Sequence, residues 1–206
     1  MTKRKKGRGL LLVVSGPSGT GKGSVLEAFY QIIERGDIYY SISMTTRKPR
    51  PGEVHGVHYF FTTREEFEQG IAAGAFLEHT QYLDNYYGTP RDEIEKQRDA
   101  GRDVILEIES DGAFQIRRAV PDARLIFILP PGMAALEQRL RGRGTEDERT
   151  ILRRLERAKE EIAKAGEYDY IILNDRLEEA ADDLRAVIRA EKSKAAYMAH
   201  YMKEMF

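Results

Sequence analysis

The sequence of 206 residues contains no cysteine, and its charges nearly cancel, with 33 basic against 34 acidic side chains. The lack of cysteine excludes disulfides, a thiolate nucleophile and cysteine-ligated zinc, and it is compatible with a reducing cytoplasm, which is the location we expect. The charge balance lacks the positive excess of a nucleic-acid-binding domain, so we expect no nucleic-acid partner.

Long apolar runs are also missing. The first run, Leu10–Val14, is too short for the apolar region of a signal peptide or for a membrane span of about 18 residues or more, so no membrane association is expected. Residues 1–8 are basic, and we expect a disordered, solvated leader. Residues 191–206 predict a C-terminal helix whose methionines and aromatic rings pack against the body or against a second subunit, which leaves a homo-oligomer open.

A glycine-rich segment gives the clearest indication of function. The residues Leu10–Val14 predict a buried strand, and Val25–Tyr30 predicts an amphipathic helix. Between them, glycines leave room for backbone N–H groups to surround an anion at the start of the helix. We therefore predict a phosphate loop that binds ATP, with Lys22 reaching the outer phosphates. The loop residues are Gly16, Pro17, Ser18, Gly19, Thr20, Gly21, Lys22, Gly23 and Ser24.

One position departs from the usual phosphate-loop pattern. Serine or threonine normally follows the lysine and meets Mg²⁺, but here Gly23 follows it and the hydroxyl comes one residue later, at Ser24. Metal contact is therefore expected to depend on phosphate oxygens and water more than on a protein hydroxyl. The alternative, a chance glycine-rich turn, does not account for the complete spacing between a strand and a helix.

The rest of the chain alternates between predicted strands and helices, which indicates a doubly wound α/β domain. Strands are expected at 39–44, 58–61, 75–82, 104–109, 124–129 and 170–173, and a turn at 85–90. Helices are expected from the loop to about 36, and at 63–73, 91–100, 110–120, 133–140, 146–165 and 177 to the end. The mixed segments between about 39 and 88 indicate an inserted lobe.

A second set of residues is suited to an anion. The loop 45–53 carries Arg47 and Arg50 between prolines, and Tyr59 and Tyr87 follow on later segments. Arginine forks and tyrosine hydroxyls brought together from separate segments would suit a phosphate monoester. The other interpretation is a solvated basic loop with tyrosines in the core.

Several of these residues, taken in order, resemble the guanylate kinase family. The matching residues after the phosphate loop are Ser43, Arg47, Arg50, Glu53, Tyr59, Glu78 and Asn85–Gly88. The resemblance continues through Ile126–Pro131, Arg139–Thr145, Arg153–Leu155 and Ile172–Asp175, and covers about residues 9–190. It implies a P-loop NTPase three-layer sandwich with a parallel sheet core, an inserted mixed α/β lobe that binds GMP, and a helical lid. The core would comprise 9–36 and 102–190, the lobe about 37–90, and the lid about 139–160.

The resemblance also implies an activity and its residues. The chain would transfer a phosphoryl group from ATP to GMP, making ADP and GDP in purine nucleotide metabolism and GMP recycling, with Mg²⁺ as cofactor. The GMP-binding residues would be Ser43, Arg47, Arg50, Glu53, Tyr59, Glu78, Tyr87, Thr89 and Glu109. Besides the phosphate loop, the ATP-binding residues would be Arg143 and Asn174. The catalytic residues would be Lys22, Arg47, Arg139 and Arg154, with Glu107 as an indirect metal contact.

The chemistry of guanine fits Glu78. Guanine presents two adjacent N–H donors, which one carboxylate accepts, whereas adenine would leave that carboxylate unpaired. Sites built on such hydrogen bonds reject the wrong substrate by about 10⁴ to 10⁵. A phosphate acceptor is already an anionic nucleophile, so the protein needs no general base.

Other functions remain open from the sequence. A kinase of the same fold could act on another phosphate ester, and a related module could hold phosphopeptides without catalysis. The arginines near the predicted lid also have two interpretations, because helical i,i+4 pairing with nearby acids explains Arg153 and Arg157. It does not explain Arg143 between Gly142 and Gly144, so we expect these two glycines to form a hinge that closes over substrate.

Overall fold

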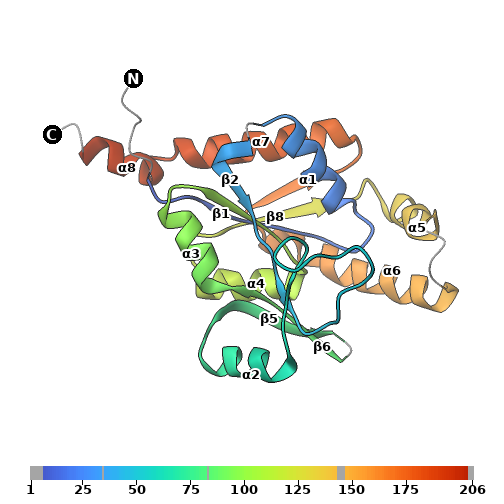
Figure 1. Cartoon of the computed structure of the whole chain (residues 1–206). Coiled ribbons are helices and arrows are strands. Elements are labelled where there is room, and N and C mark those ends of the chain that lie inside the picture. Colours follow the sequence, from blue (N-terminus) through green and yellow to red (C-terminus); the bar gives the residue numbers. More distant parts are fainter. Residues whose placement is uncertain (1–6, 34, 83, 143–146, 204–206) are drawn as a thin grey trace.

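Five parallel strands form the central sheet of the protein (Figure 1). The structure is a computed structural model that describes residues 7–33, 35–82, 84–142 and 147–203. In sheet order the strands are β2 (Ile38–Tyr40), β7 (Asp103–Glu107), β1 (Leu11–Ser15), β8 (Arg124–Leu129) and β9 (Tyr170–Leu173). All four neighbouring pairs are parallel, and the bounds of β8 and β9 are those expected from their apolar runs.

Helices cover both faces of this sheet. They are α1 (Lys22–Gln31) and α7 (Leu177–Ser193) on one face, and α3 (Arg91–Asp99) and α4 (Ser110–Ala119) on the other. Alternate side chains of a strand point to opposite faces, so Leu12 and Val14 of β1 pack with the α1 and α7 side, whereas Leu11 and Val13 pack with the α3 and α4 side. The expected three-layer α/β fold is confirmed.

A second sheet forms the inserted lobe, below the core in Figure 1. Its order is β4 (Phe60–Phe61), β3 (Met44–Thr45), β6 (Asn85–Pro90) and β5 (Phe76–Tyr82). The pair β3 and β4 is parallel and the other two pairs are antiparallel. The helix α2 (Arg64–Ala72) packs on this sheet, with the expected cap at Thr63 and with Phe67 stacked on Phe76 and Tyr86 at ring distances of 4.3 and 5.3 Å.

Two predictions for residues 39–90 are wrong. The residues 85–90 form strand β6 rather than a turn, because they pair antiparallel with β5 from Asn85 onward. The single strand expected at 39–44 is two strands in different sheets, since β2 pairs with β7 of the core and β3 pairs with β6 of the lobe. The chain therefore leaves the core sheet between Tyr40 and Met44.

Two predicted helices end earlier than expected. The first, α1, ends at Gln31 rather than near Gly36, and a 3₁₀ turn, η1 (Arg35–Asp37), follows it. The last is interrupted at Lys194, whose backbone is extended, so that α7 gives way to a separate α8 (Ala195–Lys203). The Glu191 carboxylate, 1% exposed, accepts hydrogen bonds from Lys194 and from Arg124 at the break.

The helices α5 (Met133–Gly142) and α6 (Glu148–Ala163) form a pair at the opposite end of the core from α8 (Figure 1). They have a small core of their own, which consists of Leu136, Leu140, Ile151 and Ala158. A 3₁₀ turn, η2 (Ala165–Glu167), leads from α6 to β9. Gly142 is the last residue of α5, and the predicted hinge partner Gly144 lies outside the described residues. In the described part of the chain, no helix has the length and apolar character of a membrane span.

Candidate active site

The predicted phosphate loop turns at the carboxyl end of β1 and leads directly into α1. The backbone φ angles of Gly16, Gly19 and Gly21 are 138°, 92° and 85°, values that favour glycine. A Cβ at Gly16 would lie 2.5 Å from the carbonyl oxygen of Ile128, so this position admits no side chain. Because α1 begins at Lys22, its first N–H groups face the loop and make an anion site.

The Lys22 ammonium is held by the loop itself. Its Nζ donates hydrogen bonds to the carbonyl oxygens of Gly16 at 2.5 Å and Pro17 at 3.1 Å. These contacts keep the positive charge beside the N–H groups that would meet a phosphate. The contact of Lys22 with the outer phosphates stays a prediction.

Two predicted residues contact the backbone of the phosphate loop at Thr20. Arg139 of α5 donates to the Thr20 carbonyl at 3.2 Å, and the Asn174 side-chain amide donates to the same oxygen at 2.7 Å. Arg139 also donates to the Asn174 carbonyl at 3.0 Å, which ties α5 to the end of β9. Both residues therefore brace the loop in this structure.

A third arginine approaches the loop from α6. The Nη1 group of Arg154 donates to the hydroxyl oxygen of Ser18 at 2.8 Å. Lys22, Arg154 and Arg157 line the same cavity, so it carries several positive charges beside the loop. Arg143 lies outside the described residues.

The loop before β4 holds Arg47 in a fixed orientation. The Arg47 guanidinium donates two hydrogen bonds to the Glu53 carboxylate, at 2.9 and 2.8 Å, and a third to the Lys48 carbonyl at 2.9 Å. The backbone N–H of Arg50 also donates to Glu53, at 2.7 Å. Arg47 and this N–H hold the pKa of Glu53 at about 2, so its carboxylate stays ionised. The Arg50 side chain is exposed.

Two tyrosines stand beside Arg47. The Tyr59 ring lies 5.4 Å from the Arg47 guanidinium carbon and 6.2 Å from the Tyr87 ring, in an edge contact. Burial, with the nearby Tyr87, raises the pKa of Tyr59, so its hydroxyl remains a donor. The lobe therefore brings together Arg47, Tyr59 and Tyr87, three of the four predicted phosphate-binding residues.

Glu78 is a buried carboxylate on strand β5 of the lobe sheet. It is 5% exposed, and Thr89 donates a hydrogen bond of 2.7 Å to its Oε1. Burial raises the pKa of Glu78, the hydrogen bonds from Thr89 oppose this rise, and the charge of Glu109 adds to it. The Oε2 atom faces α4, where a Cβ on Gly112 would lie 3.0 Å away.

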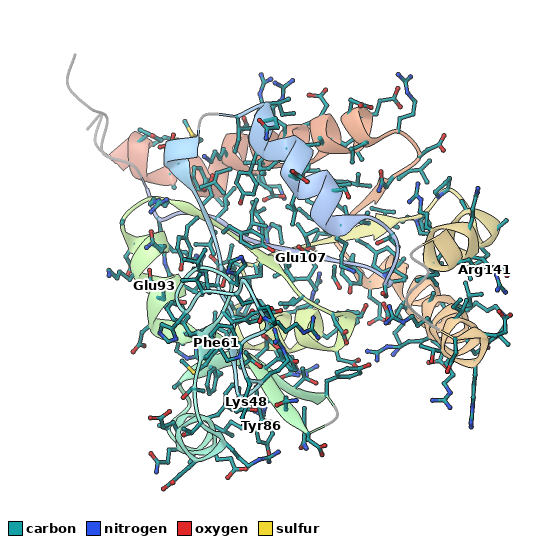
Figure 2. The ribbon with its side chains drawn as sticks, turned by 45° about the vertical axis from the view of Figure 1, so that its right-hand side comes forward. Lys48, Phe61, Tyr86, Glu93, Glu107 and Arg141 are labelled. Atoms are coloured by element: carbon teal, nitrogen blue, oxygen red, sulfur yellow. The ribbon has the colours of Figure 1, made fainter. Side chains whose placement is uncertain are left out.

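Glu107 is the last residue of core strand β7 and lies above the lobe residues Lys48, Phe61 and Tyr86 in Figure 2, whereas Arg141 lies at the far right, on α5. The Tyr40 hydroxyl donates a hydrogen bond of 2.9 Å to Glu107 Oε2. Burial and the charge of Glu107 raise the pKa of Tyr40 far above its usual value, so the hydroxyl remains protonated. The Glu107 carboxylate also faces Gly23, since a Cβ there would lie 3.9 Å from each of its oxygens.

Two adjoining cavities connect these groups. The first, of about 240 Å³, is lined by Ser43, Tyr59, Glu78, Tyr87 and Glu109, among others. The second, of about 510 Å³, is lined by Gly16, Ser18, Lys22, Arg154 and Arg157, among others. Both cavities are lined by Tyr59, Tyr82, Glu107, Ile108 and Glu109, so the phosphate-loop side and the lobe side meet there.

The structure adds cavity residues that sequence reasoning missed. They are Tyr40, Thr80, Tyr82, Asp111, Gly112 and Arg157. A local signal existed only for Gly112, because glycine within a helix is less favourable than alanine. The interpretation of Arg157 as an i,i+4 partner alone is incomplete, because it also bridges to Glu109 at 2.8 Å.

The fold and these cavities define an α/β protein of the P-loop class, with an inserted lobe whose cavity adjoins the one at the phosphate loop. Residues 8–191 match the family model described as guanylate kinase. A guanylate kinase of Streptococcus pneumoniae (strain ATCC BAA-255 / R6) is 53% identical over 184 residues, which are 89% of this chain and 88% of the relative. That of Oceanobacillus iheyensis is 45% identical over 200 residues, 97% of this chain and 96% of the relative.

A solved structure gives the same assignment. The crystal structure of guanylate kinase from Anaplasma phagocytophilum superimposes with a TM-score of 0.71 at 36% sequence identity, covering 92% of this chain and 89% of that one. The chain belongs to the guanylate kinase family.

Proposed function

We propose that the two adjoining cavities hold the two substrates of the family's reaction, ATP on the phosphate loop and GMP in the smaller cavity. As a member of the guanylate kinase family, the chain phosphorylates GMP with ATP and yields GDP and ADP. The single observation that carries the placement is the shared wall, Tyr59, Tyr82, Glu107, Ile108 and Glu109, across which the two nucleotides would meet.

The donor side is assigned to the phosphate loop and its supports. The loop N–H groups of Gly16–Ser24 and the Lys22 ammonium bind the phosphates of ATP. Arg154 faces the same cavity and stabilises the negative charge of the moving phosphoryl group. Arg139 and Asn174 keep the loop in shape through the Thr20 carbonyl. Arg143 is assigned to the ATP side on sequence alone.

The acceptor phosphate is assigned to Arg47, Arg50, Tyr59 and Tyr87. Glu53 accepts from both Nη groups of Arg47 and so fixes the guanidinium, which we assign to a phosphate oxygen of GMP. Glu53 thus acts by orienting Arg47, which is a more specific role than general GMP binding. In the transfer, a phosphate oxygen of GMP bonds to the γ-phosphorus of ATP, and the bond from that phosphorus to the bridging oxygen breaks, leaving ADP with the electron pair.

Recognition of guanine is assigned to Glu78 with Ser43, Thr89 and Glu109. The Oε1 atom of Glu78 is engaged by Thr89, so the carboxylate is oriented before any base arrives. It then accepts the two N–H groups of guanine, and an adenine in its place would leave a buried carboxylate unpaired.

The residues also fit Mg²⁺, which the family's use of ATP implies. The described residues contain no cluster of three or more histidine, aspartate or glutamate side chains that could hold a metal. The Glu107 carboxylate faces the space beside Gly23. One carboxylate is sufficient where the ATP phosphates and water supply the other Mg²⁺ ligands. When bound, Mg²⁺ neutralises phosphate charge, and Glu107, oriented by Tyr40, would hold it there directly or through water.

The parts of the chain follow from this assignment. From the sequence, we expect the lobe at about 37–90 and the lid at about 139–160. Since β2 pairs within the core sheet, we propose that the lobe begins after it, and that α5 and α6 act as the lid. We assign the enzyme to the cytoplasm, where both nucleotides are found. Self-association through α8, which exposes Met198 and Met202, stays a prediction for light scattering to test.

A coupled assay that measures ADP release with GMP, AMP, UMP and dTMP as acceptors tests the proposed function. We expect strong preference for GMP. Turnover with another base at equal efficiency would contradict the assignment of Glu78, and ATP binding without any turnover would favour the phosphopeptide-binding alternative.

A further inference from the structure

An ion-pair cluster joins α6 to the first turn of α4 at the wall between the two cavities. Arg157 of α6 donates to Glu109 at 2.8 Å and to Glu161 at 3.0 Å, and lies 4.0 Å from Asp111. Glu161 in turn accepts a hydrogen bond from the Ser110 hydroxyl at 3.2 Å. The contact between Arg157 and Glu109 spans 48 residues of sequence, so it is not a product of helical spacing.

The smaller cavity has an unusual charge for its proposed ligand. Its lining includes four carboxylates, Glu78, Glu107, Glu109 and Asp111, and no lysine or arginine among the described residues. A nucleoside monophosphate carries close to two negative charges at neutral pH. The predicted phosphate-binding arginines, Arg47 and Arg50, do not line this cavity, and Arg47 already shares its charge with Glu53. A cation at the wall of the cavity is therefore needed to offset repulsion.

Arg157 is placed to supply that charge. Arg154 and Arg157 are three residues apart on α6, so they share a face of the helix, and both line the larger cavity. Arg154 contacts Ser18 of the phosphate loop, whereas Arg157 contacts Glu109 at the rim of the smaller cavity. One face of α6 thus directs one arginine to the donor side and one to the acceptor side.

We propose that Arg157 is a positioning residue for the acceptor nucleotide. It fixes the Glu109 carboxylate and neutralises the acidic wall, so that the smaller cavity admits the dianionic monophosphate. This inference rests on the proposed binding of GMP in that cavity. The side chains of Arg157 and Glu109 are 47% and 66% exposed, so the pair adds little to the stability of the fold. A change in the KM for GMP in an Arg157 variant would therefore not reflect a loss of stability.

The test compares R157A, R157Q and R157K with the unchanged protein in steady-state assays, varying GMP and ATP separately. Loss of the charge should raise the KM for GMP by about tenfold, with kcat and the KM for ATP changed by less than about twofold. R157K should restore most of the affinity, because it keeps the charge. Without Arg157 the acidic wall repels the dianion, and salt screens this repulsion, so the KM for GMP in R157A should fall toward that of the unchanged protein as KCl is added.

R153A provides the matched control, because Arg153 is an exposed arginine of the same helix that lines neither cavity. It should behave as the unchanged protein. In the variant E109Q, adding R157A should raise the KM for GMP by much less than it does alone, since the partner is already gone. Unfolding midpoints within about 2 °C would show that the fold is kept.

Two results would overturn the inference: an unchanged KM for GMP in both R157A and R157Q, or equal rises in KM for both nucleotides. Failure of the proposed function is distinguishable, because the unchanged protein would then fail to prefer GMP in the same assay. R157Q keeps the side-chain length, so it still decides the question if R157A does not fold.

Discussion

The Tyr40 hydroxyl lies 2.9 Å from Glu107, and the Glu107 carboxylate faces the position where Gly23 replaces the usual hydroxyl residue of a phosphate loop. The core sheet creates this relationship, because β2 and β7 are neighbouring parallel strands whose carboxyl ends meet beside the loop. Tyr40, Glu107 and Gly23, from three separate segments, thus lie next to one another.

Replacing Tyr40 with phenylalanine should lower the affinity for the divalent metal ion. The change removes the hydrogen bond that orients Glu107, and a hydrogen bond to a charged group contributes about 1.5–3 kcal/mol. We expect the Mg²⁺ concentration for half-maximal activity to rise several-fold. Binding of Mn²⁺ to the ADP complex, followed by electron paramagnetic resonance, should weaken in parallel.

The control for this variant is Tyr30→Phe. Tyr30 contacts the Tyr40 ring at 6.3 Å, and its buried hydroxyl has no hydrogen-bond partner in the described part of the chain. Its loss should leave the metal dependence unchanged. An unchanged Mn²⁺ affinity in Tyr40→Phe would contradict a role for this hydroxyl in orienting Glu107.

Replacing Gly23 with serine should compensate for a weakened Glu107. A Cβ at position 23 would make ordinary contacts of 3.9 Å with both Glu107 oxygens, so the side chain fits. We expect Glu107→Gln to raise the Mg²⁺ requirement, and the double variant with Gly23→Ser to lower it again, since a hydroxyl returns next to the lysine. If serine gives no recovery of metal affinity, Glu107 does not stand in for the missing hydroxyl.

Replacing Glu53 with glutamine should impair the acceptor side alone. Arg47 would lose its bidentate carboxylate partner, and its guanidinium would no longer be held in one orientation. We expect the KM for GMP to rise about tenfold, a loss of about 1.4 kcal/mol in binding, with the KM for ATP unchanged. Glu65→Gln, an exposed acid on α2, is the control. A fall in the KM for GMP would show instead that Glu53 competes with the phosphate.

The affinity for GMP should decrease on acidification through the titration of Glu78. Burial raises the pKa of Glu78 above the ordinary glutamate value, so the carboxyl protonates at a higher pH than usual and then cannot accept two N–H groups. GMP binding is therefore strongest above this pKa and weakens as pH falls through it. Glu53, with a pKa of about 2, stays ionised across this range and adds no dependence.

Calorimetric titration with GMP between pH 5 and pH 8 would measure this effect. The phosphate of GMP also titrates near a pKa of about 6, so Glu78→Gln is the necessary comparison. The Glu78→Gln variant should bind GMP more weakly, and its affinity should vary with pH only through the titration of the GMP phosphate. Identical pH profiles for the two proteins would rule out Glu78 as the titrating group.

The sequence predicted elements whose causes are local. The strand at 124–129 and the cap at Thr63 follow from apolar runs and capping chemistry within a few residues, and the glycines of the phosphate loop follow from their spacing. Strand β6 was missed because asparagine, glycine and proline in 85–90 favour a turn locally, whereas pairing with β5 decides the outcome.

The missed site residues have partners that lie far away in sequence. Tyr40 meets Glu107 across 67 residues, and Arg157 meets Glu109 across 48. Lys194 ends α7 where the buried Glu191 is tied to Arg124 of β8, a contact that no local pattern predicts. Pairings of this kind become visible only when the sheet order is known.

Replacing Gly112 with alanine should separate the recognition of guanine from the stability of the fold. Gly112 lies in the first turn of α4, and an added Cβ would come within 3.0 Å of Glu78 Oε2 and 3.3 Å of the Ile108 side chain. Alanine favours a helix by about 1 kcal/mol over glycine, which offsets part of the steric cost. We therefore expect the free energy of unfolding to change by less than about 1 kcal/mol, but the KM for GMP to rise at least about tenfold, because the carboxylate must move.

The control is Gly166→Ala. A Cβ there would meet nothing within 4 Å, so this change should leave both quantities unchanged. An unaltered KM for GMP in Gly112→Ala would mean that Glu78 tolerates displacement, and that its orientation does not set the fit of the base.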